Sequence, residues 1–104
     1  MGTITAHSMN LPQSVQKIIE LIISKTKPEK IILFGSRARG DNRENSDFDI
    51  ACIFKQKNEQ AWSHLLVNLH EEVMTLWSVD LVDYSELSEE YKNNIKKEGV
   101  TLYE

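Results

Sequence analysis

Two aspartates one residue apart, Asp47 and Asp49 in the segment SDFDIA, stand where a polar stretch of the chain turns apolar. Side chains two positions apart on a β-strand project from the same face, so these two carboxylates would point together. Their repulsion is costly unless a cation lies between them, and hard divalent ions such as Mg²⁺ prefer oxygen ligands. A pair of such ions can hold the attacking and leaving oxygens of a phosphoryl or nucleotidyl transfer. Two aspartates with this spacing are also common as solvated residues at the start of a strand. The neighbouring residues must therefore decide between a metal-binding pair and a solvated one.

The residues before this pair favour a phosphate ligand. Gly35 and Ser36 end the preceding apolar run and are separated from Asp47 by ten residues. Glycine lets a phosphate approach the backbone, and the amides and the hydroxyl that follow can donate hydrogen bonds to it. Phosphate groups on one side and metal-binding carboxylates on the other would form one nucleotide site.

All three arginines of the chain lie between these two motifs. Arg37 and Arg39 directly follow the glycine–serine pair, and guanidinium groups match phosphate oxygens in shape and charge. Ion pairing with Asp41 and Glu44 is the alternative for these arginines, and for Arg43 we expect only that.

The segment is not a P-loop. Gly35 and Gly40 have the required separation, but Asp41 and Asn42 stand where a P-loop has Lys and Ser or Thr. A glycine fingerprint for dinucleotides is absent from the sequence as well.

The hydrophobic pattern predicts the elements that must position these residues. Apolar residues at helical spacing predict helices over 11–26, 58–77 and 88–98, with a short helical turn at 36–40. Short apolar runs predict strands over 30–34, 47–54 and 78–84, to which 100–104 can add a last one. The order α-β-α-β-α-β-α predicts an α/β (α+β) fold, a small mixed β-sheet flanked by helices. Residues 1–10 lack periodicity and are expected to be a flexible lead-in to a single domain over 11–104.

Composition narrows the class of protein. A chain of 104 residues with 40% apolar and 27% charged residues is typical of one soluble domain. Lys and Arg number 12 against 16 Asp and Glu, and the net charge of −4 argues against nucleic-acid binding by the whole surface. Cys52 is the only cysteine, so this chain forms no internal disulfide and has no Cys-based metal motif. No stretch approaches the roughly 20 apolar residues of a membrane span, and no secretory signal is visible, so we expect no membrane association and a cytoplasmic protein.

Taken together, the motifs resemble a known family. Gly35-Ser36, ten residues and then Asp47-Phe48-Asp49 resemble the signature of the nucleotidyltransferases related to DNA polymerase beta. More narrowly, the chain is similar to the minimal nucleotidyltransferases, which prokaryotes commonly encode beside a HEPN-domain partner. From about Leu11 onward, the segments FGSRARGD, SDFDIA, VDLVDY and KKEGVTLYE occur in the order that the family shows.

The resemblance implies a third carboxylate on a later strand. In the family this residue lies between two aliphatic residues, and Asp80 matches between Val79 and Leu81. An acidic residue inside an apolar strand is also costly if it has no partner. Asp83 is the other candidate, but it stands near the end of the strand, where we expect a solvated or turn-forming residue.

The activity that the resemblance implies is Mg²⁺-dependent transfer of AMP from ATP to an acceptor hydroxyl, with two ions expected. The family's acceptor is a tyrosine of a cognate HEPN toxin, which the modification silences. The roles carried over are metal binding and catalysis for Asp47, Asp49 and Asp80, and nucleotide binding for Gly35 and Ser36. Arg37 and Arg39 join them as candidates for nucleotide binding because of their chemistry and position, which do not decide between the two.

Two other functions remain open from the sequence. The chain can be an antitoxin that neutralises its toxin by docking alone, without catalysis. It can also be a nucleotidyltransferase for small hydroxylated antibiotics, although those relatives generally carry an added helical region that this sequence lacks. Whether it forms oligomers, with itself or with a partner, is not encoded in any pattern of the sequence.

Overall fold

The computed structural model describes residues 2–104 and contains the predicted helices and strands in the predicted order, with two 3₁₀-helices in addition. The elements are η1 (Ala6–Asn10), α1 (Gln13–Thr26), β1 (Lys30–Phe34), α2 (Ser36–Arg39), β2 (Phe48–Ile53), α3 (Glu59–Glu72), β3 (Val79–Asp83), η2 (Tyr84–Glu86), α4 (Glu89–Glu98) and β4 (Val100–Tyr103).

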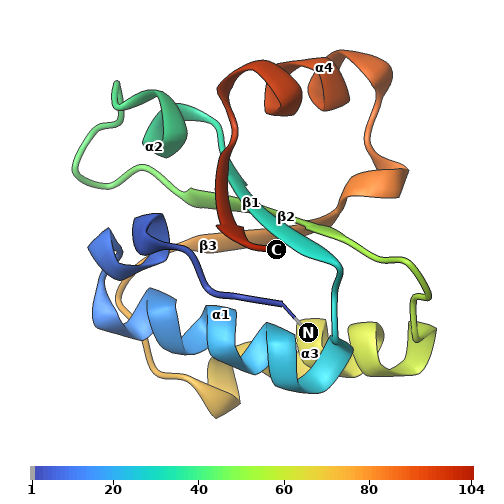
Figure 1. Cartoon of the computed structure of the whole chain (residues 1–104). Helices are drawn as coiled ribbons and strands as arrows, with labels where there is room; N and C mark the ends of the chain where they lie inside the picture. The colour runs from blue at the N-terminus through green and yellow to red at the C-terminus, as the bar shows by residue number, and fades with distance from the viewer. Residues whose placement is uncertain (1) are drawn as a thin grey trace.

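The strands form one mixed sheet in the order β3-β2-β1-β4, which confirms the predicted fold class (Figure 1). β1 is antiparallel to both β2 and β4, whereas β2 and β3 are parallel. The end of β1 therefore lies at the same edge of the sheet as the beginnings of β2 and β3. This edge carries the glycine–serine pair and all three candidate aspartates.

Helices cover the two faces of the sheet unequally. α1 and α3 pack on one face, and α4 lies over the other (Figure 1). The first face holds the larger core, which includes the fully buried Ile18, Ile22, Ile31 and Ile50. Burying a side chain of this size stabilises the fold by about 1.5–3 kcal/mol. The α4 face holds a small cluster whose buried members are Ile32, Ala51 and Ile95, so less of that face is buried.

The beginning of the chain pairs with β4. Backbone hydrogen bonds join Thr3 to Glu104 in both directions, and the amide of Thr5 donates to the carbonyl of Leu102 at 2.9 Å. The Thr5 hydroxyl also donates to the carbonyl of Thr101 at 2.6 Å. The sequence predicts a flexible lead-in over 1–10, of which Met1 lies outside the described residues. The observed pairing is made by backbone hydrogen bonds. Such bonds leave no pattern of apolar side chains in the sequence, so the hydrophobic pattern did not predict it.

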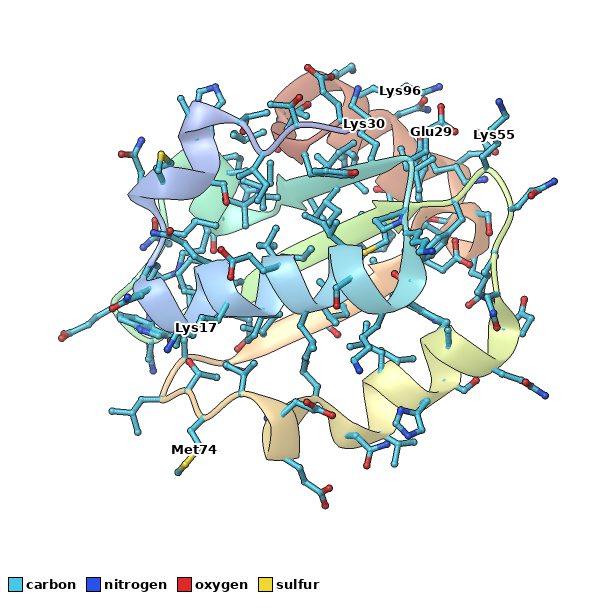
Figure 2. The ribbon with its side chains drawn as sticks, turned by 60° about the horizontal axis from the view of Figure 1, so that its bottom comes forward. Lys17, Glu29, Lys30, Lys55, Met74 and Lys96 are labelled. Carbon is cyan, nitrogen blue, oxygen red and sulfur yellow. The ribbon has the colours of Figure 1, made fainter. Side chains whose placement is uncertain are left out.

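α3 ends at Glu72, before the predicted end at residue 77. The apolar spacing included Leu76, but its side chain is fully exposed, and Met74 points away from the protein (Figure 2). The chain leaves the helix here because β3 must begin beside β2, where the amide of Phe48 donates to the carbonyl of Ser78 at 2.8 Å. None of the helices within residues 2–104 is long and apolar enough to cross a membrane.

Candidate active site

Gly35 joins β1 to α2 with a backbone φ of +75°, a conformation that L side chains rarely adopt. A Cβ atom at this position would run into the Oδ2 atom of Asp49 on β2. The pairing of Phe34 with Asp49 in the antiparallel ladder brings the two strands together here. Glycine is therefore required for two reasons, its positive φ and the lack of space for a Cβ atom. The turn that leads into Ser36 lies against the Asp49 carboxylate.

Asp49 and Asp80 are direct neighbours in the parallel ladder of β2 and β3. Residues in register on neighbouring strands lie about 4.8 Å apart and project from the same face of the sheet. This is the α4 face, because Asp49 alternates with Ile50, which is buried in the core on the other side. Asp49 is partly buried, whereas Asp80 is exposed.

Asp47 lies one residue before β2 begins and is exposed. Burial raises the pKa of Asp49, and the negative charges of Asp80 and Asp47 raise it further, while Arg39 has a smaller opposite effect. The three carboxylates thus form a concentration of negative charge at one edge of the sheet, with Asp49 at its centre.

The donor set fits hard divalent ions, but it is not a closed metal cage. Within residues 2–104, no three His, Cys, Asp or Glu side chains lie close enough together to hold an ion by themselves. Mg²⁺ usually takes one or two carboxylates and completes its six ligands with water and substrate phosphates. Asp49 and Asp80, with Asp47 nearby, would hold ions in that way, and a bound cation would relieve the repulsion that raises the pKa of Asp49.

The structure gives the guanidinium of Arg37 other partners than a phosphate. Its Nε and Nη2 atoms both donate to the carbonyl of Ser46, at 3.2 and 3.0 Å, and Nη2 also donates to the carbonyl of Glu44 at 3.0 Å. The group stacks over the ring of Phe48 at 4.3 Å and lies 5.2 Å from the ring centre of Trp77. Arg37 is thus held in the loop that precedes Asp47.

Arg39 forms ion pairs with Asp41 at 3.1 Å and with Glu98 of α4 at 3.2 Å. The alternative role expected for the arginines, pairing with Asp41, therefore holds for Arg39. Arg43, for which only ion pairing was expected, forms no ion pair within the described part of the chain, and its backbone amide instead donates to the Ser46 hydroxyl.

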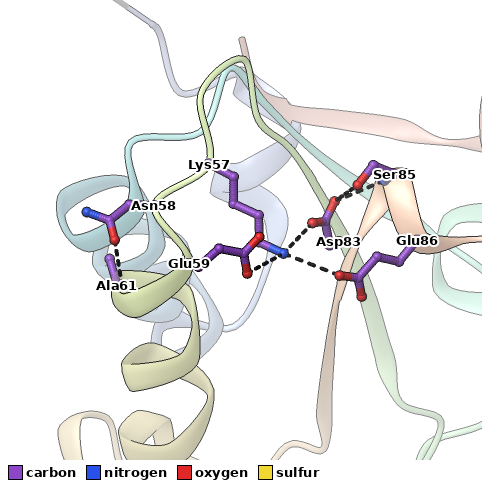
Figure 3. A network of polar contacts seen from close by, with 7 residues as sticks. All are labelled: Lys57, Asn58, Glu59, Ala61, Asp83, Ser85 and Glu86. Carbon is purple, nitrogen blue, oxygen red and sulfur yellow. Dashed lines mark hydrogen bonds and ion pairs between the residues drawn. The ribbon is translucent and has the colours of Figure 1, made fainter.

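Asp83, the rejected candidate for the third carboxylate, stands three positions after Asp80 on β3 and so lies on the opposite face of the sheet. It has a structural role, and Figure 3 shows its contacts with Lys57 and Ser85. Its buried carboxylate pairs with Lys57 Nζ at 2.7 Å and accepts hydrogen bonds from the amide and hydroxyl of Ser85. Burial alone would raise the pKa of Asp83, but these hydrogen bonds outweigh it and lower the pKa. Asp83 forms a turn, as expected, but it is buried rather than solvated.

Asp47 and Asp80 are exposed, and a pocket of about 410 Å³ beside them is lined by residues that include Arg37, Asn42 and Phe48. A pocket of about 970 Å³ lies at the other end of β1, lined by residues that include Lys27, Lys55 and Tyr103, and it contains none of the candidate site residues. The exposed Asp47 and Asp80 are accessible to a large molecule that approaches the edge of the sheet.

Sequence reasoning missed two aromatic residues of this region, Phe48 and Trp77. Their rings meet edge to face with centroids 5.7 Å apart and together cover the Arg37 guanidinium. Their positions in the sequence could have identified them as residues of the site. Phe48 lies between the two aspartates of the motif, and Trp77 precedes the strand of Asp80.

Comparison with known families gives a match over most of the chain. The family model described as polymerase beta, nucleotidyltransferase, matches residues 16–104. The probable protein adenylyltransferase MntA of Haemophilus influenzae is 30% identical over 88 residues, which cover 84% of this chain and 77% of that protein.

Similar solved structures include toxin–antitoxin complexes. A chain in the crystal structure of a toxin–antitoxin with AMP-PNP aligns with a TM-score of 0.65 and 32% identity, over 83% of this chain and 69% of that one. A chain in the structure of the tri-AMPylated Shewanella oneidensis HEPN toxin with MNT antitoxin aligns with a TM-score of 0.58 and 26% identity, over 86% of this chain and 69% of that one.

Proposed function

This chain belongs to the polymerase beta nucleotidyltransferase family, and from that premise we propose that it transfers AMP from ATP to a hydroxyl group of a protein. The observation that carries the proposal is the register that sets Asp49 beside Asp80, with Gly35 against the Asp49 carboxylate. The Asp49 carboxylate thus lies between the glycine–serine turn and Asp80, an arrangement that suits a nucleotide with metal ions on one side.

The reaction exchanges one bond to phosphorus for another. The acceptor oxygen bonds to the α-phosphorus of ATP, the bond from that phosphorus to the oxygen bridging to the β-phosphate breaks, and pyrophosphate leaves. Asp80 takes the proton of the acceptor hydroxyl, because it is exposed and lies beside Asp49. Mg²⁺, when bound, supplies the positive charge that stabilises the attacking and leaving oxygens.

The other residues of the site bind the metal ions and the triphosphate. Asp47 and Asp49 would hold the two Mg²⁺ ions, and Asp80 would complete the set of carboxylate ligands. The backbone after Gly35 and the hydroxyl of Ser36 bind the triphosphate. Arg39 reaches the phosphates by exchanging its exposed ion pairs, which are weak enough to be given up for a phosphate.

We further propose that the acceptor is a tyrosine of a HEPN-domain protein, which the added AMP inactivates. The supporting observations are the antitoxin and adenylyltransferase relatives and the exposure of Asp47 and Asp80. An exposed site suits a side chain presented by another protein better than a small antibiotic, which is usually bound in a concave pocket.

Mass spectrometry tests this function directly. The purified chain, Mg²⁺, ATP and a HEPN-domain protein encoded beside it should yield the partner with added AMP, located on tyrosine by peptide fragmentation. Asp47→Asn with Asp49→Asn should abolish the addition. Glu71→Gln with Glu72→Gln, two exposed carboxylates at the end of α3, should leave it unchanged.

The second candidate function, docking without catalysis, is favoured by the antitoxin complexes among the similar structures. The same Asp47→Asn and Asp49→Asn variant separates the two. If it binds the HEPN protein and protects cells from it as well as the wild type does, docking is the function and transfer is not.

A further inference from the structure

We propose that Arg37 is a positioning residue that holds Asp47 in its metal-binding place, and not a phosphate ligand. The inference rests on the proposed function, because it assigns a role within the same site. It starts from the contacts of one side chain, which comes from α2, directly after Ser36.

The hydrogen bonds of Arg37 are directed at the backbone before Asp47. Two of its N–H groups converge on the carbonyl oxygen of Ser46, at 3.2 and 3.0 Å, and a third bond reaches the carbonyl of Glu44 at 3.0 Å. The Ser46 carbonyl belongs to the peptide group that leads into Asp47. Because that group is planar, fixing its oxygen also fixes the direction in which the chain enters Asp47.

The stacking contacts extend this support to the other carboxylates. Phe48, between Asp47 and Asp49, lies 4.3 Å below the guanidinium, and Trp77, three residues before Asp80, lies 5.2 Å away. The amide of Phe48 also donates to the carbonyl of Ser78. One side chain therefore contacts the segments that carry all three aspartates, at the edge of the sheet where α2 lies (Figure 1).

This set of contacts suits arginine and no other residue. A planar guanidinium can donate several hydrogen bonds in its own plane while its faces stack on aromatic rings. Lysine keeps the charge but has neither the fork nor the flat face. The same engagement argues against a phosphate role, since binding a phosphate would require Arg37 to leave three hydrogen bonds and two rings.

Two measurements on the nucleotide-free protein test this role. The first is Mn²⁺ affinity, from the electron paramagnetic resonance signal of the free ion, with Mn²⁺ standing in for Mg²⁺ on oxygen ligands. Arg37→Met should weaken it by about 10- to 100-fold, the usual effect of removing a group that orients metal ligands. The second is amide hydrogen exchange in metal-free protein, where residues 43–48 should exchange faster.

The matched control is Arg43→Met. It makes the same change of charge and length in the loop that Arg37 contacts, but the Arg43 side chain is exposed, so Mn²⁺ affinity and exchange should stay at wild-type values. Arg37→Lys provides a second variant that keeps the charge if Arg37→Met does not fold, and it should lose affinity in the same direction.

Each outcome decides something different. Unchanged Mn²⁺ affinity with a weaker affinity for ATP would assign Arg37 to the phosphates and overturn the inference. A lower melting temperature with unchanged affinity and unchanged exchange at 43–48 would make it a purely structural residue. If the wild type bound Mn²⁺ neither alone nor with a non-hydrolysable ATP analogue, the proposed function would fail, whereas the exchange measurement would still decide whether Arg37 holds the loop.

Discussion

Replacing Asp49 with Asn should stabilise the metal-free protein and at the same time remove its response to Mg²⁺. The carboxylate of Asp49 lies beside that of Asp80, and burial and repulsion raise its pKa. Asparagine has nearly the same shape without the charge. The variant therefore keeps the packing and removes a repulsion that the native sequence retains.

The size of the gain follows from the geometry of the sheet. Neighbouring strands are about 4.8 Å apart, so the two charges lie roughly 5 Å apart. Their repulsion is about 0.8 kcal/mol in a water-like dielectric and about 3 kcal/mol at an effective dielectric constant near 20. Because Asp80 is exposed, we expect a value near the lower end, about 1 kcal/mol. In a domain of this size, that raises the melting temperature by about 4–8 °C.

Thermal unfolding in EDTA, followed by circular dichroism, measures the effect on Asp49→Asn, Asp80→Asn and the double variant. Removing either charge relieves the same repulsion, so the gain of the double variant should fall short of the sum by about 1 kcal/mol. Adding Mg²⁺ should raise the melting temperature of the wild type but not of the variants. Asp41→Asn, which removes a carboxylate paired with Arg39, should give no gain.

The stabilisation of the metal-free protein by Asp49→Asn should also depend on pH, in a defined direction. Because the pKa of Asp49 is raised, the folded protein binds this proton more tightly than the unfolded chain does. Wild-type stability relative to Asp49→Asn should therefore fall as pH rises from the ordinary Asp pKa, about 4, through the raised value. Below that window the two proteins should be equally stable with respect to this group.

Two results would refute this reasoning. If Asp49→Asn lowered the melting temperature in EDTA, the carboxylate would be making favourable contacts instead of repulsive ones. If the two single changes were strictly additive, Asp49 and Asp80 would not face one another. Either result would remove the main support for a metal site between β2 and β3.

Three further predictions concern other parts of the fold. Asp83→Asn should lower the free energy of unfolding by about 2–3 kcal/mol at pH 7, because it weakens buried hydrogen bonds to a charged group; denaturant titration should show the difference shrinking as pH falls through the lowered pKa of Asp83. Gly35→Ala should abolish AMP transfer and destabilise the protein, since its φ of +75° is strained for alanine and its methyl group would displace Asp49; activity and unfolding assays of the same preparation measure both effects. Cys52 is fully buried, and burial raises the pKa of its thiol to about 12, so a thiol reagent at neutral pH should react with the unfolded but not with the native protein.

Local patterns were enough to predict the elements, but not which strands are neighbours. The apolar runs predicted β1, β2 and β3 with small errors at their ends, since those runs reflect burial within each segment. The sequence offered Asp80 and Asp83 as alternatives, and alternation placed them on opposite faces. Only the parallel register, which depends on the whole fold, sets Asp80 beside Asp49.

Hydrogen bonds from side chains to backbone carbonyls could not be predicted from any sequence pattern. Arg37 was expected at the phosphates because of its position after Ser36, but in the structure it binds the carbonyls of Glu44 and Ser46. Every residue has a carbonyl, so the sequence carries no mark of which one an arginine will reach. The same applies to the end of α3, where Leu76 continued the helical spacing although the chain had already turned toward β3.

The aspartates of β2 and β3 show how the fold separates stability from chemistry. Asp83 lies on the face covered by α1 and α3 and is neutralised by Lys57. Asp49 and Asp80 lie on the face that α4 covers less completely, and within residues 2–104 neither forms an ion pair with a basic side chain. A lysine that reached them would remove the repulsion and stabilise the protein, but it would occupy the place of the metal. The repulsion that makes this edge unstable is therefore the same property that allows it to bind Mg²⁺ and a nucleotide.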